Sequence, residues 1–232
     1  MPDEVTMPCR LSLVFAAEAS VAVVLRRGPR QWVEVIKWRT DTDDFERGQW
    51  FHGRIYPERC GLSPDGTLFV YFAMKHGRAN SAQGYERTFT AVSRPPFLTA
   101  LAMWPQGDTW GGGGRFLDNR TLRLAYAANG TSHPGVADTE ICMAPYREPH
   151  PEHLPRGLEI QTDLDHYGAD RGFVEAVDDH GTWTGTDHRG RSILARDGCI
   201  LVARQDGTET LLEDFNSDSF REVVAPAWAT TW

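Results

Sequence analysis

A stretch of the chain near its middle combines tryptophan, aspartate and glycine in a way that could bind a ligand. Trp104, Asp108 and Trp110 come directly before four consecutive glycines at residues 111–114. Ordering glycine costs more chain entropy than ordering any other residue, so such a run suits a place where backbone must approach a ligand or a neighbour closely. Aromatic faces beside one carboxylate acceptor are typical of a pocket for a small ligand or for a partner's anchoring side chain.

The glycine run has a second interpretation as a tight internal turn, because tryptophan and glycine also serve as packing and spacer residues. It is not a phosphate-binding loop, since no Lys-Ser or Lys-Thr pair follows it. The candidate ligand-binding or partner-binding residues are Arg94, Trp104, Asp108, Trp110, Gly112, Gly113 and Arg115.

Metal, cofactor and nucleophile patterns are weak in this sequence. His150 and His153 lie among prolines and not on a helix that would aim both rings at one ion. The segment that starts at Asp214 begins like a calcium loop, but it has Ser219 where glycine is needed and Ala225 where glutamate is needed. There is no Gly-x-Ser-x-Gly motif. We therefore expect no metal and no cofactor, and nothing here supports a catalytic activity.

The charge balance makes nucleic acid and membranes unfavourable partners. The 232 residues include 32 acidic and 24 basic side chains, which gives a formal charge of -8, and such a field repels phosphate backbones and anionic lipids. Two acidic residues near the start replace the basic region of an export signal. The four cysteines form no CxxC pair, which suits reduced thiols. These patterns predict a soluble cytoplasmic protein.

The first part of the chain predicts antiparallel strands. Short β-rich runs (RLSLVF, SVAVVLRR and QWVEVIKW) alternate with turns or charged stretches. In the third run, Trp32, Glu34, Ile36 and Trp38 share one face, while Val33, Val35 and Lys37 share the other. Because neither face is cleanly polar, we expect both faces of this strand to be covered, as in stacked sheets.

Short Asp-containing turns precede several later strands. Ser63-Pro64-Asp65-Gly66-Thr67 leads into LFVYFAM, and similar turns stand at positions 119, 197 and 206. These segments resemble the SPDG-type repeats of WD40-like and TolB-like β-propellers, although the turns are unevenly spaced and no Gly-His or Trp-Asp pair recurs. The resemblance implies a mainly β fold with antiparallel sheets, in which an irregular propeller of about five blades is favoured over a β-sandwich.

We expect a single β domain over residues 1–232, with a long loop rich in Pro, Gly and His near residues 127–157. The function predicted is that of a non-enzymatic protein-interaction module, for example an acidic bacterial immunity or adaptor protein with a basic partner. The alternative is a small-molecule or carbohydrate-binding protein, or a hydrolase, that uses the Trp/Asp pocket beside the glycine run. In the C-terminal PAWATTW, Trp228 and Trp232 either dock on a partner or cover a sheet edge, and we favour the second.

Overall fold

The computed structural model describes residues 7–28, 31–75, 87–106, 109, 111–125, 158–162 and 182–231. These residues are mainly β strands in antiparallel sheets, as the sequence predicts, with two short 3-10 helices, η1 (Pro57–Arg59) and η5 (Ala227–Ala229). None of the described residues belongs to a helix that is long and apolar enough to cross a membrane. The Pro/Gly/His-rich stretch near residues 127–157 lies outside the described residues.

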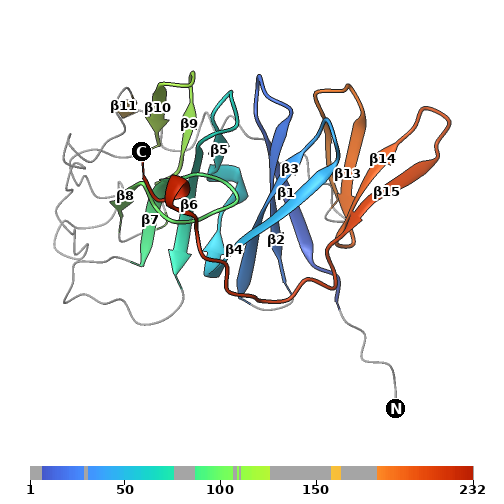
Figure 1. Cartoon of the computed structure of the whole chain (residues 1–232), viewed down its shortest axis with the longest axis horizontal. Coiled ribbons are helices and arrows are strands. Elements are labelled where there is room, and N and C mark those ends of the chain that lie inside the picture. Colours follow the sequence, from blue (N-terminus) through green and yellow to red (C-terminus); the bar gives the residue numbers. More distant parts are fainter. Residues whose placement is uncertain are drawn as a thin grey trace, which may run out of the picture.

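The largest sheet has eight strands and is built from two halves (Figure 1). The first half is the meander β1 (Arg10–Phe15), β2 (Val21–Arg27), β3 (Trp32–Arg39) and β4 (Asp44–Ile55). The second half is β6 (Phe69–Lys75), β7 (Thr88–Ser93) and β8 (Ala102–Pro105), with the short β5 (Gly61–Leu62) paired to β6. Strand β4 joins them, because its first part, up to His52, pairs with β3 across a register shift and its last three residues pair with β6.

Two smaller sheets stand at the ends of the eight-stranded one. One contains β9 (Gly114–Phe116), β10 (Thr121–Leu124) and β11 (Glu159–Thr162), and its β10–β11 pair is parallel. The other is the antiparallel meander β12 (Trp183–Thr186), β13 (Ser192–Arg196), β14 (Cys199–Ala203) and β15 (Glu209–Asp214).

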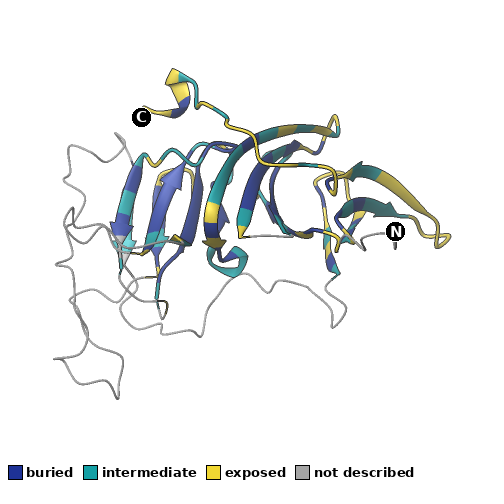
Figure 2. Ribbon diagram, turned by 90° about the horizontal axis from the view of Figure 1, so that it is seen from below, coloured by how far each residue is buried: buried dark blue, intermediate teal, exposed yellow. Residues whose placement is uncertain are grey.

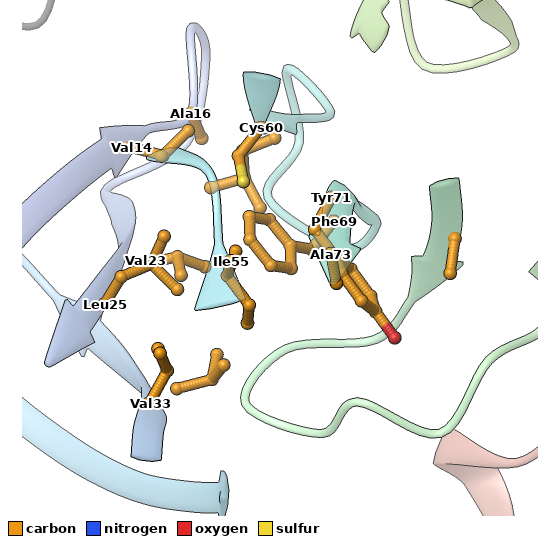
Figure 3. Packing of buried hydrophobic residues seen from close by; sticks show 13 residues of the cluster. Val14, Ala16, Val23, Leu25, Val33, Ile55, Cys60, Phe69, Tyr71 and Ala73 are labelled. Atoms are coloured by element: carbon orange, nitrogen blue, oxygen red, sulfur yellow. The ribbon is translucent and has the colours of Figure 1, made fainter. Parts of the chain in front are cut away.

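Side-chain alternation in β3 sends apolar groups into two different clusters. Val33 and Val35 enter a core shared with β6 and β7, which Figure 3 shows from close by. Ile36 and Trp38 enter a second core shared with β12–β15. The expectation that both faces of this strand are covered is therefore confirmed.

A third cluster joins β6–β8 to β9–β11 around the buried Trp104 and Leu122. The four sheet units thus stack face to face in the order β12–β15, β1–β4, β5–β8 and β9–β11 (Figure 1). Each interface is made of interdigitated apolar side chains, which is what fixes the units against one another.

In three of these units, the turn between the first two strands is closed by an aspartate. Asp65 Oδ1 accepts a hydrogen bond from Thr67 N at 3.0 Å, Asp118 Oδ1 one from Thr121 N at 2.7 Å, and Asp187 Oδ1 one from Arg189 N at 3.0 Å. A carboxylate that accepts a hydrogen bond from a backbone amide two or three residues later stabilises a tight turn.

Neighbouring turns at this end of the strands are also joined to each other. The carbonyl oxygen of Pro64 accepts hydrogen bonds from the amides of Glu18 at 2.9 Å and Ala19 at 3.0 Å. The side-chain oxygen of Asn119 accepts one from the amide of Asp65 at 2.8 Å. The turns of β1–β2, β5–β6 and β9–β10 therefore form a continuous row at one end of the strands.

Candidate functional site

The glycine run is packed against neighbouring strands. Gly112 and Gly113 have φ angles of +99° and +89°. The Gly112 amide donates to Ala125 O at 2.7 Å, and the Gly113 amide donates to Thr90 Oγ1 at 2.8 Å. A side chain at either position would collide with the neighbouring segments. Glycine is therefore required here because neighbouring segments of the same chain lie directly against the backbone.

The other predicted binding residues are spread over two places. Trp104 is fully buried in the third cluster and shares its neighbour Thr90 with the glycine run. Arg115 lies half-buried on β9. Asp108 and Trp110 lie outside the described residues, so the Trp/Asp pocket stays a prediction. Arg94 lies elsewhere, and its Nε is 3.5 Å from the carbonyl oxygen of Thr231.

Arg94 thus contacts a C-terminal segment that we call the strap, residues 215–231. The strap leaves the end of β15 and runs along the eight-stranded sheet towards the β7–β8 connection (Figures 1 and 2). Gln49 Nε2 on β4 donates to Val223 O at 3.0 Å. At the far end Trp228 packs edge-on against Phe97, with ring centroids 5.6 Å apart. Trp232 lies outside the described residues.

Charged groups fix the first half of the strap. Arg26 Nε on β2 donates to Phe215 O at 3.1 Å. Arg47 on β4 donates from Nη2 to Glu213 Oε1 at 2.6 Å and from Nε to Asp218 Oδ2 at 3.2 Å. Its guanidinium also lies over the Phe215 ring, 5.0 Å from the centroid. Because these bonds are charge-assisted and partly shielded from water, they hold the segment more firmly than neutral ones would.

The strap presents apolar side chains to solvent. Phe220, Val224 and Trp228 are 55%, 82% and 55% exposed, and they are three of the six large apolar side chains exposed among the described residues. Phe220 contacts the Trp32 ring on β3, with centroids 4.5 Å apart. Residues 219–225 make no backbone–backbone hydrogen bond within the described part of the chain. This is an anchored extended segment whose apolar side chains are largely exposed to solvent.

A row of buried polar groups lies beneath the strap. Arg26 and Glu34 are 2% and 1% exposed. Neither Glu34 Oε2 nor Trp50 Nε1 has a hydrogen-bond partner among the described residues. The pKa of Glu34 is raised to about 7, mainly by burial. The nearby Asp218 carboxylate also raises this pKa, and its effect is larger than the opposing effect of Arg26. Glu34 therefore carries a proton over much of the neutral and acidic range.

A cleft of about 790 Å³ lies elsewhere, at one end of the β12–β15 sheet. Arg189 and Arg204 stand on two turns beside it, and Val202, Thr210 and Leu212 form its strand side. Arg191 also lines the cleft, but its guanidinium is already bonded to Asp43, Asp187 and the carbonyl of Thr40. The cleft is open and mixed in polarity.

No family model matches this chain, and neither does a curated protein or a solved structure. Its function therefore has to be argued from the residues. In the described ranges, no three His, Cys, Asp or Glu side chains gather in the way that would hold a metal ion. The strap and the polar row are the places where exposed apolar groups and buried charge come together.

Sequence reasoning missed Phe220, Val224 and the Arg26–Glu34 row. One signal was available, because Glu34 stands between Trp32 and Ile36 on a strand face that is otherwise apolar. A second was the stretch from Asp218 to Pro226, which has no regular alternation and yet contains three apolar residues that are not glycine, proline or alanine, Phe220, Val223 and Val224. Neither signal says that the two segments meet.

Proposed function

We propose that this chain is a protein-interaction module that binds its partner along the strap. The observation that carries the proposal is the exposure of Phe220, Val224 and Trp228 at four-residue intervals on an anchored extended segment. Aromatic side chains supply much of the energy of protein interfaces, and clustered exposed apolar groups mark such surfaces. Because Arg26, Arg47 and Gln49 hold the strap in place, little ordering cost remains to be met on binding.

The partner we propose is a basic protein. The chain has a formal charge of -8, and opposite net charge accelerates association and orients the encounter. A bacterial immunity or adaptor protein that caps a basic effector would have this chemistry. The apolar strap would then supply affinity, while the acidic surface supplies the rate and the selection against acidic proteins.

For the fold, we propose an irregular propeller-like array whose blades are the four stacked sheet units, with about five blades as the full count. Three features support this. The two middle units pack through both faces, as blades do, and the first strands β12, β1, β5 and β9 contact one another in that order. The row of turns at one end of the strands supports it as well, because equivalent turns of successive blades lie side by side.

The test compares a strap variant with a matched surface variant. Immobilised wild-type protein captures proteins from the native host at low and moderate salt, and the stoichiometric basic partner is then titrated against each variant. F220S/V224S/W228S should weaken binding by about 100-fold or more, which corresponds to losing one or two interface anchors. L117S/L211S, which alters two exposed apolar residues outside the strap, should bind like wild type.

Two results would contradict this function. One is the absence of any stoichiometric partner under both salt conditions. The other is a strap variant that keeps its fold, judged by circular dichroism and thermal unfolding, and binds the partner as tightly as L117S/L211S does.

The alternative function, binding of a small molecule or carbohydrate, is favoured by the cleft beside Arg189 and Arg204. A ligand that binds only the folded state raises the melting temperature. Thermal-shift screening against sugars, nucleotides and divalent cations therefore tests it. A shift that R189S/R204S abolishes would favour the alternative, and no shift from any class would reject it.

A further inference from the structure

The polar row beneath the strap runs straight across three strands. Arg26 on β2 is the register partner of Glu34 on β3, and Glu34 is the register partner of Trp50 on β4. Strap residues lie over both ends of this row, since Arg26 donates to Phe215 O and Trp50 contacts the Phe220 ring, with centroids 6.3 Å apart. Glu34 is therefore the carboxyl group that the strap covers.

The cations near Glu34 are already committed to other partners. Arg26 donates to Phe215 O and, at 2.7 Å, to Gly28 O, and its guanidinium lies over the Trp50 ring. Arg47 is paired with Glu213 and with Asp218.

Other charged groups of the strap and of β4 also face this region. The strap brings Asp218 and the exposed Arg221 near Glu34, and of these two Asp218 has the larger effect on the pKa of Glu34. His52 on β4 stacks on Trp32, one position along the same face, with centroids 4.7 Å apart. The buried thiol of Cys9 also interacts with Arg26.

Ionisation of Glu34 destabilises the closed strap. A buried carboxylate with an oxygen that accepts no hydrogen bond loses several kcal/mol of hydration, and Asp218 adds repulsion of like sign. The protonated acid avoids both costs. When the strap lifts, water reaches Glu34 and Asp218 moves away, so the carboxyl group ionises normally.

We propose that the strap is a proton-dependent latch, which closes over β2–β4 when Glu34 carries a proton and lifts when Glu34 loses it. The latch is a property of the chain alone and does not depend on the partner proposed above. It would let a change of pH within the neutral range decide whether residues 215–220 stay docked. The second half of the strap has its own anchors at Gln49 and Phe97 and is expected to respond less.

The direction of the pH dependence follows from the two states of Glu34. Its pKa is about 7 with the strap closed, against an ordinary value of 4.5. The equilibrium constant for closure is therefore largest below about pH 4.5 and falls by up to about tenfold per pH unit as the pH rises towards 7. Above that range it is constant, because Glu34 is ionised in both states.

Hydrogen exchange of the full chain, read by mass spectrometry in peptides covering residues 215–220 and corrected for intrinsic rates, tests the latch from pH 5 to pH 8 without any partner. Wild-type protection of these amides should fall at least about tenfold over this range. E34Q mimics the protonated acid and should hold the strap closed with no pH dependence. Three results would overturn the latch. They are constant protection of residues 215–220 in wild type, a loss of protection in E34Q equal to that in wild type, or a peptide at residues 158–162 whose protection falls with pH as much as that of the strap.

Two control variants and one direct titration complete the test. E222Q removes an exposed carboxylate from the strap itself, and H52Q removes the neighbouring imidazole; both should keep the wild-type pH dependence, and its loss in H52Q would assign the switch to His52 and overturn the proposal. If E34Q does not fold, the carboxyl ¹³C shift of Glu34 in wild type decides. A midpoint clearly above 4.5 and up to about 7 supports the latch, because the strap is closed before Glu34 ionises, and a midpoint at 4.5 overturns it.

Discussion

Arg191 holds Asp43 with both of its terminal nitrogens, across 148 residues of sequence. Nη1 donates to Oδ2 at 2.8 Å and Nη2 donates to Oδ1 at 2.7 Å. The same guanidinium donates from Nε to Asp187 Oδ2 at 2.7 Å and from Nη2 to Thr40 O at 3.0 Å. One side chain thus joins the β12–β13 turn to the β3–β4 turn and fixes two sheet units against each other.

Replacing this guanidinium by an ammonium group should destabilise the protein. In R191K a single point charge cannot reproduce the fork that satisfies two carboxylates and a carbonyl. We expect the free energy of unfolding to fall by about 2 kcal/mol, because bonds to charged, partly buried groups are lost. Urea unfolding measures it. R204K, on an exposed arginine of the same sheet, should change stability by less than about 0.5 kcal/mol, and equal effects of the two variants would contradict the expectation.

The same pair predicts a loss of stability in acid. Hydrogen bonding to Arg191 is the main cause that lowers the pKa of Asp43 below its ordinary value of 3.8. The stabilisation is therefore complete above pH 3.8 and is lost as the pH falls through the lowered pKa. D43N should unfold with a smaller difference between pH 5 and pH 3 than wild type does. An unchanged difference would show that Asp43 does not contribute.

A methyl group at Gly113 should disrupt the packing of the glycine run. Its φ of +89° strains any L side chain, and a Cβ there would lie 2.7 Å from Cβ of Arg59 and 3.0 Å from its carbonyl carbon. We expect G113A to lose about 3 kcal/mol or more of unfolding free energy, from strain and forced displacement together. Chemical denaturation measures it.

Gly190 provides the matched control, since its φ is +73° and a Cβ there meets nothing within 4 Å. G190A should therefore cost only the backbone strain, about 1 kcal/mol. If both variants lose the same amount, the close approach at Gly113 is not what requires glycine.

Gln49 should couple the strap to the β7–β8 connection. Its Oε1 accepts a hydrogen bond from Leu98 N at 2.7 Å, while its Nε2 donates to Val223 O at 3.0 Å. Q49A should lower the free energy of unfolding by about 1–3 kcal/mol, because it leaves the Leu98 amide without its partner. Hydrogen exchange at Leu98 should accelerate, whereas Q205A, in an exposed turn, should leave it unchanged. Equal exchange in the two variants would contradict the coupling.

The described cysteines should differ in reactivity. Cys9 and Cys60 are buried thiols that form no disulfide, and burial raises the pKa of Cys9 to about 11. Cys199 is half-buried, and its pKa is also raised by burial. Because alkylation needs an exposed thiolate, iodoacetamide at pH 8 should modify Cys199 before Cys9 and Cys60 in the native protein. Peptide mapping reads the order, and modification of Cys9 as fast as that of Cys199 would contradict it.

Local patterns in the sequence predict much of the strand content. RLSLVF, SVAVVLRR and QWVEVIKW are close to β1, β2 and β3, and the turn around Asp65 precedes β6 as expected. Strand β8 begins only at Ala102, after the Pro95-Pro96 turn. These elements are predictable because alternation and turn chemistry act over a few neighbouring residues.

The candidate site is less predictable, for a reason of distance along the chain. Arg26 and Phe215 are 189 residues apart, and Arg47 and Asp218 are 171 apart. Each residue alone reads as an ordinary charged or turn residue. Only the contacts between these distant residues anchor the strap and bury Glu34.

The amino-acid order by itself determined the β class, the apolar character of both faces of β3 and the tight Asp turns, because each follows from the pattern of residues close in sequence. Only the tertiary structure decided which sheets stack, where the strap lies and which carboxyl group is deprived of water. Those outcomes depend on long-range packing, and the energy of a buried charge is set by whatever segment finally covers it.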